Sequence, residues 1–243
     1  MSVSIVEKIK DRFNDKETKE LAGGSLIFFG TKIIGIGMTY LFTWWVAYNY
    51  GAGKWGVFAL CFTTLNVFAM LGMLGFDAIF IKYIAEYSGK NEQGKLKDVY
   101  LKGFGIVLLI VCPISILLFL FPHQFCKIFL DGKALDAWIR VVAVTLPAFV
   151  LFQLNNAAIS GLKKMIAYGV FKNIFLYGVT LLFFFVFSYS IFPQYFSRFI
   201  GGGILLLLTY GIVSYGGVVL NTIYFLVKTG IHKTVSVFSL SRK

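Results

Sequence analysis

The sequence has few charged side chains for its length. Only 14% of its 243 residues are Asp, Glu, Lys or Arg, whereas a soluble globular domain carries about 25%. Hydrophobic residues make up 58% of the chain, and they form runs of about twenty residues or more, long enough for a helix to cross a bilayer. The composition therefore excludes an ordinary soluble domain and indicates an integral membrane protein.

Histidine and cysteine, the usual metal ligands, are also scarce. The chain has two histidines and three cysteines, namely His123, His232, Cys61, Cys112 and Cys126. No set among them has the spacing of a metal site. There is no glycine-rich loop that ends in Lys-Ser or Lys-Thr, and no cluster of carboxylates or pair of histidines. We therefore expect no metal, no cofactor and no enzymatic activity.

Acidic residues are fewer than basic ones, which gives a formal net charge of +12. Such an excess can indicate nucleic-acid binding. Here, however, the basic residues gather in alternate connections, at 8–19, 82–102, 163–172 and 228–243. This alternation is typical of cytoplasmic loops in membrane proteins. It predicts that both termini are cytoplasmic. It also explains the positive charge without a nucleic-acid partner, and we expect none.

The apolar runs predict six membrane-spanning helices. We place a basic cytoplasmic or interfacial segment at 1–20, a six-helix transmembrane lobe at 21–228 and a basic cytoplasmic tail at 229–243. The spans run at about 21–49, 55–87, 98–121, 137–161, 166–192 and 200–228. The alternation of apolar and polar residues with a period of two, which is typical of a membrane β-barrel, is absent. We therefore predict an all-α, multi-pass protein of the cytoplasmic (inner) membrane.

Polar side chains recur at helical spacing inside four of these spans. The four sets are Ser25, Lys32, Thr39 and Thr43; Thr63, Asn66, Met70 and Asp77; Thr145, Asn156, Ser160 and Lys163, with Gln153 nearby; and Tyr210, Ser214, Gly217 and Asn221. An isolated Ser or Thr in a membrane helix usually holds neighbouring helices together. Four polar stripes, two of them with an ionisable residue, favour a shared hydrated cavity.

Asp77 is the ionisable residue with the least freedom of position. A carboxylate inside an apolar run costs a few kcal/mol unless it faces protein or water, so we expect Asp77 to face inward. Lys82 and Glu86 follow at a spacing that allows them to pair where the helix leaves the membrane. Lys32 has a longer side chain, which either faces the cavity or reaches the inner interface.

Several segments resemble a known family. They are Leu21–Ser25, Tyr50–Phe58, Leu74–Asp77 with Lys82–Tyr87, and Ala158–Lys164, in this order. They resemble the N-terminal half of polysaccharide-biosynthesis flippases of the Wzx type, within the multidrug/oligosaccharidyl-lipid/polysaccharide exporter superfamily. The resemblance covers the first 165 residues, and the last two spans fit it by hydropathy only.

The resemblance implies a transporter that moves a lipid-linked oligosaccharide across the membrane for O-antigen, capsule or exopolysaccharide assembly. Such a transporter works by alternating access and is generally driven by an ion gradient. Its anionic, sugar-bearing substrate requires cations and amides on the cavity wall. The candidates are Lys32, Lys82, Arg140 and Lys163 for charge, and Asn66, Gln153 and Asn156 for sugars. Asp77 is a candidate for ion coupling or for structural pairing with a cation.

Members of that family have two six-helix lobes, and this chain carries one. The resemblance therefore implies a second lobe, supplied by homodimerisation or by a separate C-terminal half. The other expected partners are a polyprenyl pyrophosphate sugar and membrane lipids. Two alternatives remain open: a non-transporting scaffold or vestigial subunit of polysaccharide assembly, and an exporter of small molecules or drugs from the same superfamily.

Overall fold

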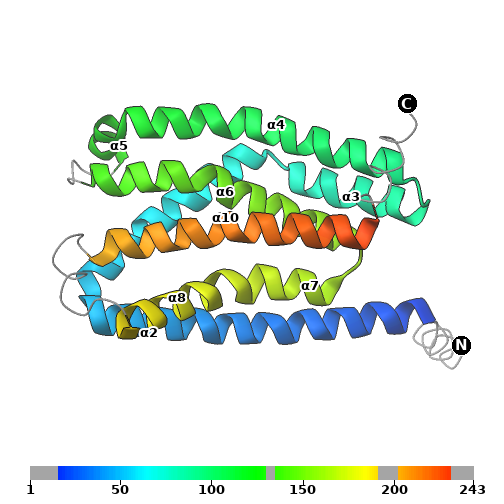
Figure 1. The fold of residues 1–243 in the computed structure, drawn as a ribbon, viewed down its shortest axis with the longest axis horizontal. Helices are drawn as coiled ribbons and strands as arrows, with labels where there is room; N and C mark the ends of the chain where they lie inside the picture. Colours follow the sequence, from blue (N-terminus) through cyan, green and yellow to red (C-terminus); the bar gives the residue numbers. More distant parts are fainter. Residues whose placement is uncertain (1–15, 130–134, 191–201, 231–243) are drawn as a thin grey trace, which may run out of the picture.

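The computed structural model describes residues 16–129, 135–190 and 202–230, and the elements among them are helices (Figure 1). They are α2 (Lys16–Met73), α3 (Phe76–Gly89), α4 (Gln93–Leu120), α5 (Pro122–Phe129), α6 (Asp136–Gly161), α7 (Met165–Gly169), the π-helix η1 (Val170–Phe175), α8 (Leu176–Ser190) and α10 (Gly202–Thr229). The prediction of an all-α fold is confirmed.

Six helical stretches in the described part are long and apolar enough to cross a membrane. They are Gly23–Tyr48, Gly51–Met73, Gln93–Leu120, Asp136–Gly161, Met165–Phe183 and Leu206–Thr229. Each corresponds in order to one of the six predicted spans, which confirms the six-helix membrane fold.

The first two spans belong to one element, α2, which reverses direction at Gly51. The backbone of Gly51 has φ 81° and ψ 157°, a conformation that only glycine adopts readily. The second half of α2 therefore runs back toward the other end of the bundle, diagonally to the first half (Figure 1).

A second break divides the segment predicted as one span at 55–87. Helix α2 ends at Met73, and the chain turns through Leu74 (φ 45°) and Gly75 (φ 81°) before α3 begins. Hydropathy does not detect this break, because Leu and Gly are both common in membrane helices. The break places Asp77 in the first turn of α3.

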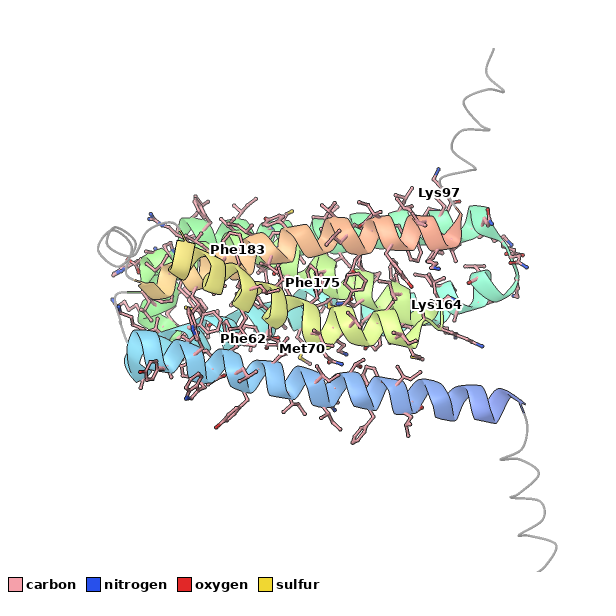
Figure 2. All side chains as sticks on the ribbon, turned by 60° about the horizontal axis from the view of Figure 1, so that its bottom comes forward. Phe62, Met70, Lys97, Lys164, Phe175 and Phe183 are labelled. Atoms are coloured by element: carbon pink, nitrogen blue, oxygen red, sulfur yellow. The ribbon has the colours of Figure 1, made fainter. Side chains whose placement is uncertain are left out.

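The first described residue of α2 and the last of α10 lie at the same end of the bundle (Figure 1). Lys97 and Lys164, which belong to connections predicted to be cytoplasmic, lie toward this end as well (Figure 2). The side of the membrane that this end faces remains a prediction. Residues 1–15 and 231–243, which include most of the predicted terminal segments, are outside the described residues.

Helix α6 occupies the centre of the bundle and packs against α10, α4 and α3. Its second half is buried on nearly all sides, including Phe152, Leu154 and Ala158. A membrane helix surrounded in this way is positioned by its neighbours, because lipid contacts only a small part of its surface.

The first half of α2 packs closely against α7 and η1 through small residues. A Cβ atom on Gly35 would lie 2.7 Å from both Cβ and the backbone oxygen of Asn173. A Cβ atom on Gly169 would overlap Thr31. Small residues let helix backbones approach in this way, and the gain is van der Waals contact.

Candidate functional site

A partly open cavity of about 210 Å³ lies among the helices of the bundle. Its wall includes residues from α2, α3, α6, α7, η1, α8 and α10. They are Phe62, Asn66, Met73, Asp77, Ile81, Phe149, Phe152, Gln153, Asn156, Ala157, Tyr168, Lys172, Leu176, Tyr177 and Tyr210. Residues from distant parts of the sequence, such as Phe62 and Tyr210, therefore meet at one site.

The structure brings four of the predicted site residues to this cavity: Asn66, Asp77, Gln153 and Asn156. The side-chain nitrogen of Asn66 donates to the backbone oxygen of Phe62 at 2.8 Å, which leaves its side-chain oxygen as an acceptor. Asn156 is buried at 4% exposure. These residues come from two of the four predicted polar stripes.

The four predicted cations do not line the cavity, and all of them are exposed: Lys32, Lys82, Arg140 and Lys163. The face of α2 that packs inward contains Thr31 and Phe42, so Lys32 points away from that face. Arg140 precedes Gln153 on α6 by about 20 Å of helix, at 1.5 Å per residue.

Lys172 is a cavity cation that the sequence patterns did not single out. It lies in the π-helix η1, and such helices are frequent at functional sites. Its Nζ donates to the Tyr168 hydroxyl at 2.7 Å and lies 5.1 Å from the centre of that ring. Tyr168 stacks on Phe28 of α2, with ring centres 5.4 Å apart. The ammonium group is therefore held in a defined position.

Four aromatic rings gather on another part of the cavity wall. The centre of the Tyr210 ring lies 5.6 Å from Phe62, 6.0 Å from Phe149 and 6.5 Å from Tyr177. Phe62 and Tyr210 meet at 89°, the edge-to-face arrangement that aromatic rings favour. Aromatic residues from α2, α6, α8 and α10 thus form one cluster, which we call the aromatic wall (Phe62, Phe149, Tyr177 and Tyr210).

A buried hydrogen-bond network ties α4, α6 and α10 together beside the cavity. The Tyr100 hydroxyl donates to Oδ1 of Asn155 at 2.6 Å, and Nδ2 of Asn155 donates to the Thr222 hydroxyl at 2.9 Å. Nδ2 of Asn221 donates to Oδ1 of Asn156 at 3.0 Å. This last bond occupies the oxygen of Asn156 and leaves its amide hydrogens available to the cavity.

The stripe predicted in the sixth span therefore has two roles. Tyr210 faces the cavity, whereas Asn221 bonds to α6 and Gly217 packs against Phe152. In the first span Thr39 bonds to the backbone oxygen of Gly35 at 2.9 Å within its own helix. Several polar residues in these stripes therefore bond within or between helices and do not face a shared cavity.

Glu86 pairs with Lys90, at 2.6 Å, and not with Lys82 as the spacing suggested. The hydrogen bond and charge of Lys90 lower the pKa of the Glu86 carboxyl. Both residues lie where α3 meets the connection to α4, outside the membrane-spanning stretches. The pairing leaves the predicted cation Lys82 exposed beside it.

No group of three or more His, Cys, Asp or Glu side chains within the described ranges is arranged to hold a metal ion. His123 and Asp136 approach to 3.5 Å between α5 and α6. Two such ligands are fewer than a structural metal site requires.

Comparison with known proteins gives a family and a fold. The model of the MatE family matches residues 28–186. A solved crystal structure of a MATE mutant superimposes with a TM-score of 0.69 and 17% sequence identity. The match covers 90% of this chain and 48% of that one, so the chain spans about half of its length. At this identity the likeness shows the fold alone. No curated protein matches the chain.

Proposed function

The chain belongs to the MatE family, and on this basis we propose that it is one lobe of a flippase for lipid-linked oligosaccharides. The family and the fold support a multi-pass membrane transporter of the multidrug/oligosaccharidyl-lipid/polysaccharide exporter superfamily. The observation that supports the substrate is the composition of the cavity wall, which combines amides and phenols with one lysine and one aspartate.

The amides of Asn66, Gln153 and Asn156 suit the hydroxyl groups of a sugar, since each amide carries both donors and an acceptor. Lys172 suits an anionic phosphate group. We add it to the cations expected from the sequence. Lys32, Lys82, Arg140 and Lys163 are exposed outside this cavity, so a substrate-binding role for them would require surfaces that a second lobe completes.

Asp77 is expected from the sequence to serve either in ion coupling or in structural pairing. It lines the cavity with its side chain exposed, and in the described part of the chain no Lys, Arg or His nitrogen lies within the 4.0 Å of a salt bridge to it. A carboxylate without such a partner in a membrane cavity favours ion coupling. We propose this role for Asp77.

We propose that the active transporter contains a second lobe. The chain matches 48% of the solved structure's length, and its first and last described helix ends lie on the same side of the bundle (Figure 1). Two copies could therefore insert in the same orientation and share an axis along the membrane normal. A separate C-terminal half is the other possible source.

The proposal is tested in cells that depend on this chain for surface polymer. Asn156→Leu and Lys172→Gln are expected to reduce polymer at the surface while membrane levels of the protein remain normal. Thr63→Ala is a matched control, because Thr63 is exposed and bonds only within its own helix. Normal polymer output from both cavity variants would contradict the flippase assignment and favour a scaffold subunit.

The aromatic wall gives a reason to consider a second function, export of organic cations. Aromatic faces attract cations, and Asp77 would supply the opposite charge. This alternative predicts that cells without the chain accumulate ethidium and make normal amounts of polymer.

A further inference from the structure

Among the described residues, two tyrosine hydroxyls at the cavity have no protein partner. Tyr210 is only 1% exposed and Tyr177 is partly buried, and in the described part of the chain neither hydroxyl bonds to a protein group. Elsewhere Tyr100 bonds to Asn155 and Tyr215 to the backbone oxygen of Val144. Buried phenols normally find a partner. The Tyr210 hydroxyl is therefore available to a ligand in the cavity that it lines.

The rings that carry these hydroxyls belong to the aromatic wall, where Phe62 and Phe149 complete an apolar surface. A sugar ring has one face of C–H groups that packs against aromatic rings and an edge of hydroxyls that requires hydrogen bonds. Tyrosine offers an aromatic face for the C–H groups and a hydroxyl for the hydrogen bonds in one side chain.

The aromatic wall itself carries no charged side chain, which favours an uncharged ligand group there. The charged residues of the cavity, Asp77 and Lys172, lie outside the aromatic wall. Six neutral side chains with hydrogen-bonding groups surround them, namely Asn66, Gln153, Asn156, Tyr168, Tyr177 and Tyr210. An organic cation would leave the buried Tyr210 hydroxyl and the amide hydrogens of Asn156 without partners, at a cost for each.

The volume of the cavity suits a ligand group of about one ring. Sites for drug-sized ligands measure roughly 300–1,000 Å³, and this cavity measures about 210 Å³.

We propose that the aromatic wall is a subsite for a single uncharged sugar ring. The hydroxyls of Tyr177 and Tyr210 bond to hydroxyls of the sugar, and the ring packs against Phe62 and Phe149. The inference rests on the proposed function, because the ring would be one sugar of the lipid-linked oligosaccharide. The proposed function did not assign these residues, which would bind the sugar and not the lipid phosphate.

The test uses the 243-residue chain in lipid nanodiscs and measures binding of geranyl pyrophosphate with and without glucose, galactose or N-acetylglucosamine attached. At least one sugar-bearing probe is expected to bind more tightly than bare geranyl pyrophosphate. Tyr210→Phe and Tyr177→Phe keep the rings and remove one hydroxyl each. Each is expected to reduce that preference roughly 3- to 10-fold, the effect of one neutral hydrogen bond, and to leave binding of the bare probe unchanged.

Tyr40→Phe is the matched control, since Tyr40 is 71% exposed and lies outside the cavity; it should not change the preference. A sugar preference that survives both Phe variants would overturn the subsite and leave the proposed function standing. Absence of any sugar preference would overturn both. If ethidium binds and Tyr210→Phe weakens it, the aromatic wall is a cation site and the inference is wrong. Melting temperatures of the variants identify any that fail to fold, in which case the other Phe variant decides.

Discussion

Replacing Gly35 with Ala is expected to separate η1 from α2 and to disturb the cavity cation. The added Cβ would lie 2.7 Å from the backbone oxygen of Asn173, and no rotamer change can move a backbone atom. The helix must therefore shift by several tenths of an ångström. Lys172 is the neighbour of Asn173 in the sequence, so the shift also moves its ammonium group.

The magnitude follows from a matched pair of substitutions on the same helix. A Cβ atom added to Gly37 would meet nothing within 4 Å, and Gly37 is exposed. Both Gly→Ala changes gain the same helix propensity, up to about 1 kcal/mol. Their difference therefore isolates overpacking, which typically costs about 1–3 kcal/mol. We expect Gly35→Ala to be less stable than Gly37→Ala by this amount.

The assay is reversible unfolding of each variant in mixed detergent micelles, followed by circular dichroism, together with polymer export in cells. Gly35→Ala should lower both stability and export, and Gly37→Ala should lower neither. Equal stabilities for the two variants would refute the close approach of α2 and η1. Lower stability with unchanged export would refute the link between this contact and Lys172.

Two further perturbations test the hydrogen bonds and ion pairs of the structure. Tyr100→Phe removes the donor to Asn155 and should cost about 0.6 kcal/mol, the average for hydrogen bonds between membrane helices, and no more than about 1.7 kcal/mol, as measured by the same unfolding assay. Glu86→Gln tests the ion pair with Lys90 by its pH dependence. Because the folded-state pKa of Glu86 lies below its ordinary value of 4.5, the pair stabilises the fold above that pH, and the contribution is lost as the pH falls through the folded-state pKa. Melting curves should therefore differ slightly between the wild type and Glu86→Gln at neutral pH and converge as the pH falls below the folded-state pKa of Glu86; a difference that persists once Glu86 is protonated would contradict the pairing.

The spans were predictable from the sequence because hydropathy over about twenty residues depends little on tertiary contacts. The break at Leu74–Gly75 was not predictable from the sequence. It depends on two consecutive positive φ angles, which the presence of a Leu and a Gly does not indicate. The reversal at Gly51 was predictable only as an interruption between two helices.

The cavity was predictable in part. Asn66, Asp77, Gln153 and Asn156 stood out because polar groups are costly in lipid. Lys172 did not, because its position shortly after a basic turn groups it with the cytoplasmic cations. The tyrosines of the aromatic wall did not stand out as a group either, since aromatic residues are frequent on membrane helices for other reasons.

Two sides of the cavity, one with Asn156 and one with Lys172, are held to the bundle by different interactions. The wall with Asn156 is part of a block in which side chains of α4, α6 and α10 are hydrogen-bonded to one another. The wall with Lys172 follows the first half of α2, to which it is joined by close packing at Gly35 and by the stacked ring of Tyr168. Packed helices can slide by small shear movements without breaking directional bonds. A sliding motion between these walls would change the width of the cavity and keep the amide of Asn156 in place, so one wall would act as a fixed reference and the other as the moving part.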